Sequence, residues 1–186
     1  MIRRLLLFFL PVVIAMAAVA QANHRDPLTE AEIDKIRDSA QEPTIRLKLY
    51  VEFARARLEN IEKIHSDTKA ADREKHTRDA LQDFLDVYDE LNTNVDTFAD
   101  RGSDLRKALK PVIEADTEFG AKLRALRTSL SSANATEARD DEFLIGSAID
   151  GVDEGAKDHR DLLAEQEETF KNKKKQGHKE DTSRSQ

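Results

Sequence analysis

The stretch that decides the fold is residues 43–65, PTIRLKLYVEFARARLENIEKIH, because it can be read as a strand or as a helix. Apolar residues recur at every second position from 45 to 53, which is typical of a strand. A longer apolar series follows helical spacing: Leu47, Val51, Ala54, Leu58, Ile61 and, at its end, His65. No second strand is evident elsewhere, and a lone strand would leave its backbone hydrogen bonds unmade. We therefore predict a helix.

This helix would carry a second apolar strip on its opposite face, formed by Ile45, Leu49 and Phe53. A short preceding helix over about residues 29–40 could cover that strip by folding back across Pro43. Its start is marked by Thr29 and Glu32, which have the spacing of a capping box. The contact that we expect joins this helix to the strip: Ile33 or Ile36 against Leu49 or Phe53.

Three further helices are predicted from apolar faces of helical period. The first of these carries Leu81, Phe84, Leu85, Tyr88, Leu91, Val95 and Phe98. The second begins near Ser103, after a helix-terminating Gly102, and carries Leu105, Leu109, Val112, Phe119, Leu123, Leu126 and Leu130. Pro111 should kink this helix or mark the start of its regular part. The last helix carries Ile145, Ala148, Ile149, Val152, Ala156, Leu163 and Phe170. Polar connectors at 66–79 and 131–141 separate these segments.

The composition agrees with an all-α fold, since the 186 residues include only six Gly and four Pro. Four long amphipathic segments with short links predict an antiparallel up-and-down four-helix bundle, with a short additional N-terminal helix and a disordered basic C-terminal tail. An elongated coiled-coil dimer is the alternative. The broad apolar faces favour the bundle over a narrow two-stranded seam.

The N-terminus has the pattern of a secretory signal peptide. Two arginines in MIRR precede the apolar run LLLFFLPVVIAMAAV, and small residues follow at the end of that run. Cleavage after Ala20 or Ala22 fits equally well. An uncleaved anchor is the alternative, but residues 5–20 are shorter than the ~20 apolar residues that span a bilayer. We expect a secreted or periplasmic protein that has no stable membrane insertion after cleavage.

Charge divides the chain into three parts: a signal peptide at 1–22, a helical bundle domain at 23–170 and a basic tail at 171–186. The domain carries 22 basic and 35 acidic residues, a net charge of −13, whereas the tail has a net charge of +4. An acidic body disfavours nucleic acid as a partner. The tail could touch an anionic polymer, or it could be a solvated end.

One Glu-x-x-His pair, Glu62 and His65, has the spacing used in helical di-metal sites. Such a site needs a second pair and two more inward carboxylates, and no second pair exists in the sequence. His159 lies on the face of the last helix, but in an up-and-down bundle it would stand roughly 30 Å from His65. We therefore predict no metal site, no cofactor and no catalytic residue.

Asp116 is the residue whose position asks for an explanation, since it falls on the apolar face between Val112 and Phe119. A buried carboxylate has to be paired or neutralised. We predict a buried or half-buried ion pair that sets helix register, with Arg55 as the possible partner; a ligand-binding or proton-exchanging role is the alternative.

The other candidate motifs give little evidence for a function. Three glycines in the last helix, Gly146, Gly151 and Gly155, indicate either a close approach of a neighbour or a soft helix. The acidic cluster of Asp150, Asp153 and Glu154 lacks the spacing of a calcium loop. Asn134 begins a glycosylation triplet, NAT.

The absence of cysteine excludes disulfides and thiol chemistry, and both methionines lie in the signal peptide. The sequence therefore predicts an exported, non-enzymatic helical interaction or structural protein of the cell envelope. Its partner would be a protein or an envelope polymer. The alternative is a small-ligand- or metal-binding four-helix bundle of the cytochrome-like or ferritin-like type.

Overall fold

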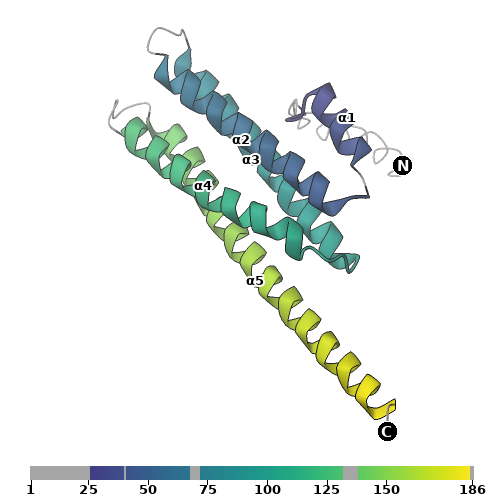
Figure 1. Ribbon diagram of the computed structural model, residues 1–186. Helices are drawn as coiled ribbons and strands as arrows, with labels where there is room; N and C mark the ends of the chain where they lie inside the picture. The colour runs from purple at the N-terminus through teal and green to yellow at the C-terminus, as the bar shows by residue number, and fades with distance from the viewer. Residues whose placement is uncertain (1–25, 40, 68–71, 132–137, 185–186) are drawn as a thin grey trace, which may run out of the picture.

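The computed structural model describes residues 26–39, 41–67, 72–131 and 138–184, and over these residues it contains helices and no strand (Figure 1). The helices are α1 (Glu30–Asp38), α2 (Pro43–Ser66), α3 (Arg73–Asp100), α4 (Arg106–Ser131) and α5 (Ala138–Arg184). The helical prediction for residues 43–65 is therefore confirmed. The predicted signal peptide at 1–22 and the triplet at Asn134 lie outside the described residues.

Helices α2 to α5 pack together as a bundle. Contacts join α2 to α3, α4 to α5, α2 to α4 and α3 to α5, and α1 lies against α2. Within the part of the chain that the structure describes, the backbones of α3 and α4, and those of α2 and α5, do not approach each other this closely, and these pairs meet only through side chains in the core. These two pairs are therefore the diagonals of the bundle, although α3 and α4 are consecutive in the sequence.

The predicted apolar faces form one shared core. Its largest fully buried side chains come from all four bundle helices and from Leu105 just before α4: Tyr88, Phe84, Phe119, Leu47, Leu58, Ile61, Leu81, Leu91, Leu105, Leu109, Leu123 and Ile145. Three of the rings form an aromatic cluster between α3 and α4, with Phe119 edge-on to both Phe84 and Tyr88 at centroid distances of 5.7 and 6.3 Å. Edge-to-face pairs of this kind add attraction beyond their buried area.

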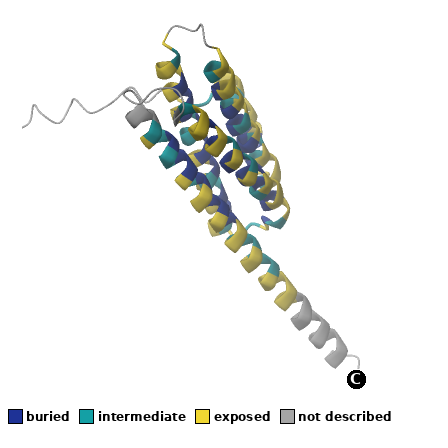
Figure 2. Ribbon diagram, turned by 90° about the vertical axis from the view of Figure 1, so that its left-hand side faces the viewer, coloured by how far each residue is buried: buried dark blue, intermediate teal, exposed yellow. Residues whose placement is uncertain are grey.

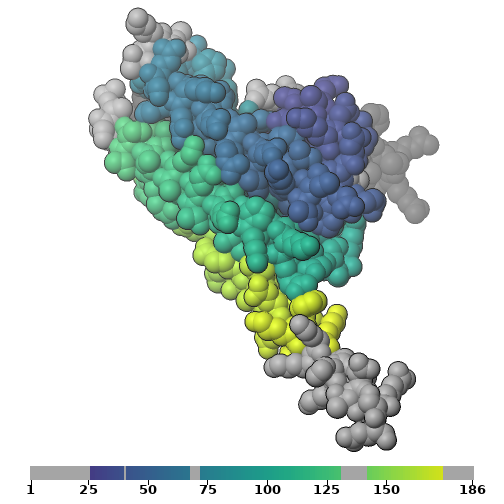
Figure 3. Space-filling model, in the orientation of Figure 1, coloured from purple at the N-terminus to yellow at the C-terminus, as the bar shows by residue number. Residues whose placement is uncertain are grey.

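Helix α1 is held on α2 by apolar and charged contacts (Figure 3). Its capping box joins Thr29 and Glu32, and Glu32 also accepts hydrogen bonds from Arg57 of α2 at 3.0 and 2.7 Å. Burial works against the charge of Glu32, but the hydrogen bonds from Arg57 and Thr29 prevail and hold its pKa below the ordinary value. Because Arg57 also donates to the carbonyl of Pro27, one guanidinium ties the start of α1 to α2.

The apolar strip that α1 was expected to cover is only partly covered. Ile36 is buried in the same core cluster as Phe53, and Leu49 packs against that cluster. Ile45, by contrast, remains 53% exposed, so its predicted place under α1 is wrong. Ile45 stands in the first turn of α2, next to the chain reversal at Pro43.

The link between α3 and α4 is a helix-terminating turn. Gly102 has a φ of 72°, and its N–H donates to the carbonyl of Ala99, while the N–H of Ser103 donates to the carbonyl of Phe98. These two bonds form a Schellman motif, which needs a left-handed residue at the glycine. Helix α4 begins at Arg106 rather than at Ser103, and it continues through Pro111, which is exposed in its second turn.

Two helices are longer than the sequence predicts. Helix α3 begins at Arg73, inside the predicted polar connector at 66–79, which the sequence allows to be partly helical, and Thr77 of that segment is buried. Helix α5 runs to Arg184, so the backbone of residues 171–184 is helical where we expected a disordered tail. Lys, Gln and Glu are good helix formers, and this segment contains no proline to stop the helix.

Helix α5 belongs to the bundle only along its first part. Burial along α5 ends after His159, with Leu162 and Leu163 half-buried and Phe170 49% exposed (Figure 2). The remainder projects away from the other helices (Figure 1). Among the described residues, no helix is both long enough and apolar enough to cross a membrane.

Candidate functional site: a buried Tyr–Asp–His cluster beneath an acidic groove

Asp116 lies in the middle of the bundle with both carboxylate oxygens engaged. Its side chain has no exposed area. Oδ1 accepts a hydrogen bond of 2.8 Å from the hydroxyl of Tyr88, and Oδ2 lies 2.9 Å from Nδ1 of His159. The three side chains come from α3, α4 and α5, so this cluster ties three helices together at one level.

The cluster has a defined direction of hydrogen bonding. Burial raises the pKa of Tyr88 far above its ordinary value, and the charge of Asp116 and the hydrogen bond to it add to the rise. The hydroxyl of Tyr88 therefore stays protonated and donates a hydrogen bond to Asp116. With a hydrogen on Nδ1, His159 donates to the same carboxylate in its neutral and in its protonated form, which leaves Nε2 as its remaining polar atom.

The structure corrects the predicted partner of Asp116. Arg55 forms a two-pronged ion pair with Glu118, at 3.0 and 2.9 Å, and does not reach Asp116. Two residues along a helix turn the side chain by about 200°, so Glu118 faces α2 while Asp116 faces the core. Asp116 is buried, as predicted, but its partners are Tyr88 and His159 rather than Arg55.

One glycine is explained by this cluster. A Cβ atom added at Gly155 would lie 2.5 Å from the hydroxyl oxygen of Tyr88 and 3.1 Å from the ring. Only glycine leaves room for that hydroxyl, which also lies 3.5 Å from the carbonyl of Val152. The close approach predicted for the glycines therefore holds at Gly155, whereas Gly146 and Gly151 face open space.

A groove between α3 and α5 lies directly above the cluster. It has a volume of about 540 Å³, and its lining includes His159, Gly151, Gly155 and Asn92. Five carboxylates line it and no Lys or Arg does: Asp89, Asp96, Asp100, Glu154 and Asp158. Gly151 leaves its side of the groove open, whereas a Cβ at Gly155 would meet Tyr88 in the core.

Two polar side chains of the lining, Asn92 and Asp89, are in surroundings that are unfavourable for them. The side-chain oxygen of Asn92 is buried without a hydrogen-bond partner, the one such atom among the residues that the structure describes. Partial burial raises the pKa of Asp89, and the charge of nearby Asp86 raises it further. A buried acceptor without a hydrogen bond costs about 1–3 kcal/mol of folding free energy, so its presence in a native fold needs an explanation.

The lining indicates what the groove can do chemically. An imidazole oriented by a carboxylate can serve in acid–base catalysis, but such a site also needs a nucleophile or donors that stabilise an oxyanion. The lining contains no Ser, Thr, Cys, Lys or Arg, so it offers acceptors rather than those groups. This arrangement suits binding of a hydrogen-bond donor.

The remaining motifs do not converge on a site. Glu62 pairs with Lys122 at 3.2 Å, and His65 is half-buried near the end of α2, so the Glu-x-x-His pair is not assembled with further ligands. Asp153 pairs with Arg124 on α4, while Glu154 lines the groove. Nowhere in the described ranges do three His, Cys, Asp or Glu side chains come together as metal ligands.

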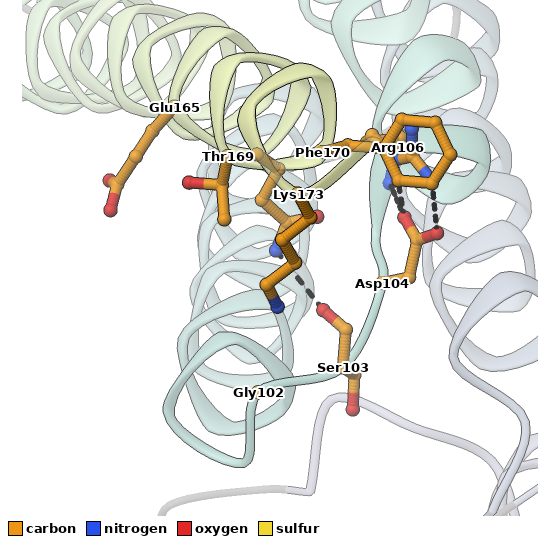
Figure 4. Close-up of a pocket in the computed structure, with 9 residues that line it drawn as sticks. Gly102, Ser103, Asp104, Arg106, Glu165, Thr169, Phe170 and Lys173 are labelled. Carbon is orange, nitrogen blue, oxygen red and sulfur yellow. Dashed lines mark hydrogen bonds and ion pairs between the residues drawn. The ribbon is translucent and has the colours of Figure 1, made fainter. Parts of the chain in front are cut away.

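A second, smaller pocket of about 370 Å³ lies where α5 leaves the bundle (Figure 4). Gln166 accepts a hydrogen bond from the N–H of Leu105 and donates one to the carbonyl of Ser103. Arg106 lies 3.7 Å from the centre of the Phe170 ring and also binds Asp104, whose pKa its hydrogen bonds lower to about 2. These contacts clamp α5 against the α3–α4 turn, so we read this pocket as structural.

Sequence reasoning found Asp116 and placed His159 on an apolar face, but it did not join the two, and it missed Tyr88 and Asn92. Tyr88 was visible only as one more member of an apolar face. Asn92 gives no signal in the sequence, because its role depends on the side-by-side placement of α3 and α5.

Comparison with known proteins adds no assignment. No family pattern matches this chain, and no curated protein or solved structure is significantly similar to it. Its function therefore has to be argued from its own geometry.

We expect Asp116→Ala to lower the free energy of unfolding by about 3–5 kcal/mol, because Tyr88 and His159 would lose their shared acceptor inside the core. The matched control is Glu114→Ala on the same helix, which is exposed and should change stability by less than about 0.5 kcal/mol. Urea unfolding followed by circular dichroism measures both. Equal stability of the two variants would contradict the role given to the cluster.

We expect Gly155→Ala to destabilise the protein by about 1–3 kcal/mol, because the methyl group would displace the hydroxyl of Tyr88. Gly146→Ala should have the opposite sign, a gain of about 0.5–1 kcal/mol, since its surroundings are open and alanine favours a helix. Thermal unfolding of the two variants side by side tests this, and a gain at both positions would refute the close approach.

Proposed function

We propose that this chain is an exported, non-enzymatic helical interaction protein of the cell envelope, whose partner is a protein or an envelope polymer. The observation that carries the proposal is the departure of α5 from the bundle as a single helix (Figure 1). A helix end that projects from the bundle adds no core to the fold, and it is available to a partner.

The charge pattern supports this element as the contact. Residues 171–186 have a net charge of +4, against −13 for residues 23–170. Lys171 and Lys173 are exposed on the projecting part of α5. A basic helix held away from an acidic body favours an anionic partner surface, because that surface meets the lysines without first meeting the carboxylates.

The scaffold that we propose is an antiparallel up-and-down four-helix bundle with α1 as a short addition. Three contacts support this arrangement. Arg46 near the start of α2 bonds to Asn94 near the end of α3, at 2.6 Å. Arg127 near the end of α4 bonds to Glu142 near the start of α5, and Leu105 before α4 bonds to Gln166, far along α5.

Export is proposed on the N-terminal sequence alone. The charged start, the apolar run and the small residues at 18, 20 and 22 are the support for it. A bundle without cysteine folds without disulfides, so its composition is compatible with either compartment and the N-terminal pattern alone supports export.

We expect N-terminal sequencing of the chain recovered from the envelope or the medium to begin at Gln21 or Asn23. Deletion of residues 1–22 should leave the protein in the cytoplasm with an unchanged helical spectrum, because that segment contributes only the export signal. Recovery of the intact N-terminus from the membrane fraction would instead identify an anchor.

We expect a variant with Gln in place of Lys171, Lys173, Lys174 and Lys175 to lose retention on an immobilised polyanion, such as polyglutamate, at low salt. Gln and Lys have similar helix propensities, so the charge changes while the helix is kept. The matched control carries Arg at the same four positions and should be retained like the native chain. If the Gln variant elutes at the same salt concentration as the native chain, the end of α5 is not the contact.

A further inference from the structure

We propose that α1 is a releasable strap over a docking face of α2, and that this face binds an amphipathic, carboxylate-bearing helix of a partner protein in place of α1. The docking face consists of Ile45, Leu49, Phe53 and Arg57, each four positions after the last, together with Arg46 beside them. The inference is independent of the proposed role of α5, because it concerns a different surface.

Helix α1 is attached to the bundle through one neighbour (Figure 3). Among the described helices it contacts α2 and no other, and Ile36 is the one residue of its nine that is buried. A helix of this length is marginal in water on its own, so it depends on its contacts with α2. Elements that bury few apolar side chains open at a lower free energy than the whole fold does. Helix α1 can therefore be released while α2 to α5 stay packed.

Two arginines of α2 hold the two ends of α1. Arg57 donates to the carboxylate of Glu32 at 3.0 and 2.7 Å and to the carbonyl of Pro27 at 2.6 Å. Arg46 donates to the carbonyl of Ile36 at 2.8 Å. The side chains of Arg57 and Glu32 are only 15% and 14% exposed, so water screens this ion pair weakly. These bonds set the direction in which a helix lies on the face.

The docking face is longer than the helix that covers it. Ile36 and Phe53 are buried in one core cluster, whereas Ile45 is 53% exposed. The cause is covalent, because α1 has to end at Asp38 for the chain to turn back into α2 at Pro43. A helix supplied by another molecule makes no such turn, and one further turn takes it over Ile45. The exposed isoleucine is thus a part of the face that a partner helix covers and α1 does not.

The pattern of α1 defines the partner. Ile33 and Ile36 share one side of α1 with Glu32, and a longer helix brings its residue at position 40 to the same side. Apolar anchors at this spacing are typical of a helix that binds in a groove. The carboxylate is needed as well, because an apolar helix would leave the shielded guanidinium of Arg57 without a counter-charge.

The test is fluorescence anisotropy of a labelled peptide, residues 26–40 of this sequence, titrated with the chain from residue 23 onwards. The native chain should bind it weakly, because its own α1 competes at the roughly millimolar effective concentration of a short linker. Replacing both Glu32→Ala and Ile36→Ala in the chain, the loosened chain, should tighten binding about tenfold or more. The matched control, Glu30→Ala, removes the same charge from an exposed position of α1 and should bind like the native chain.

Variants of the peptide test the two ends of the face in the loosened chain. A Glu32→Gln peptide keeps the capping box but loses the charge, and it should bind about tenfold more weakly. A Glu30→Gln peptide is its control and should keep the native affinity. An Ala40→Leu peptide should bind about fivefold more tightly, and Ile45→Ser in the chain should abolish that gain. Circular dichroism establishes that each chain is folded.

The proposal fails on any of four results. Equal affinities of the loosened chain and the Glu30→Ala chain would mean that α1 covers no site. Equal binding of the Glu32→Gln and Glu30→Gln peptides would remove the carboxylate from the partner. Unchanged affinity of the Ala40→Leu peptide would mean that Ile45 is not part of the face. A dimer of the native chain that exchanges α1, detected by sedimentation, would make a second copy the occupant instead of another protein.

Discussion

The carboxylate of Asp116 sets the constraint on which the arrangement of three helices depends. It sits on a face that α4 has to bury, and a charge buried there needs partners that come with the neighbouring helices. Tyr88 on α3 and His159 on α5 supply them, at 2.8 and 2.9 Å. Apolar faces alone tolerate sliding of one helix past another, but a hydrogen bond of fixed length does not. The cluster therefore fixes the heights of α3, α4 and α5 relative to one another.

The same constraint explains the groove. Because the hydroxyl of Tyr88 reaches across to α5, residue 155 has to be glycine. Gly155 makes room for Tyr88 in the core, and Gly151, one turn away on α5, leaves the groove above the cluster open. The acceptor-lined groove thus lies directly over the part of the core where Tyr88 packs against α5. A side chain added at Gly155 would disturb the core, while one added at Gly151 would only fill the groove.

The helices were predictable because burial selects apolar residues at helical spacing, and that spacing is a local property of the sequence. Even in the stretch 43–65, the helical series is longer than the alternation, and the residues form helix α2. Partners across helices were not predictable in this way. Height along the bundle alone predicts Arg55 as the partner of Asp116. The direction in which each side chain faces instead pairs Arg55 with Glu118 and Asp116 with His159. Asn92 likewise becomes a groove residue only because α3 lies beside α5 in the bundle, with α4 diagonally opposite α3.

Contacts near Gln166 and Phe170 hold α5 at the point where it leaves the bundle. Gln166 satisfies both the N–H of Leu105 and the carbonyl of Ser103, and Phe170 lies under the guanidinium of Arg106. These contacts fix the direction of α5 at the point where its core contacts stop. Lys171 and Lys173 follow on the same helix and point away from the acidic groove. If the chain were flexible at this point, these lysines could fold back and meet the carboxylates of the groove. Separation of the two charged surfaces within one small molecule is thus a consequence of helix continuity, and the Gln166 contacts are what maintain it.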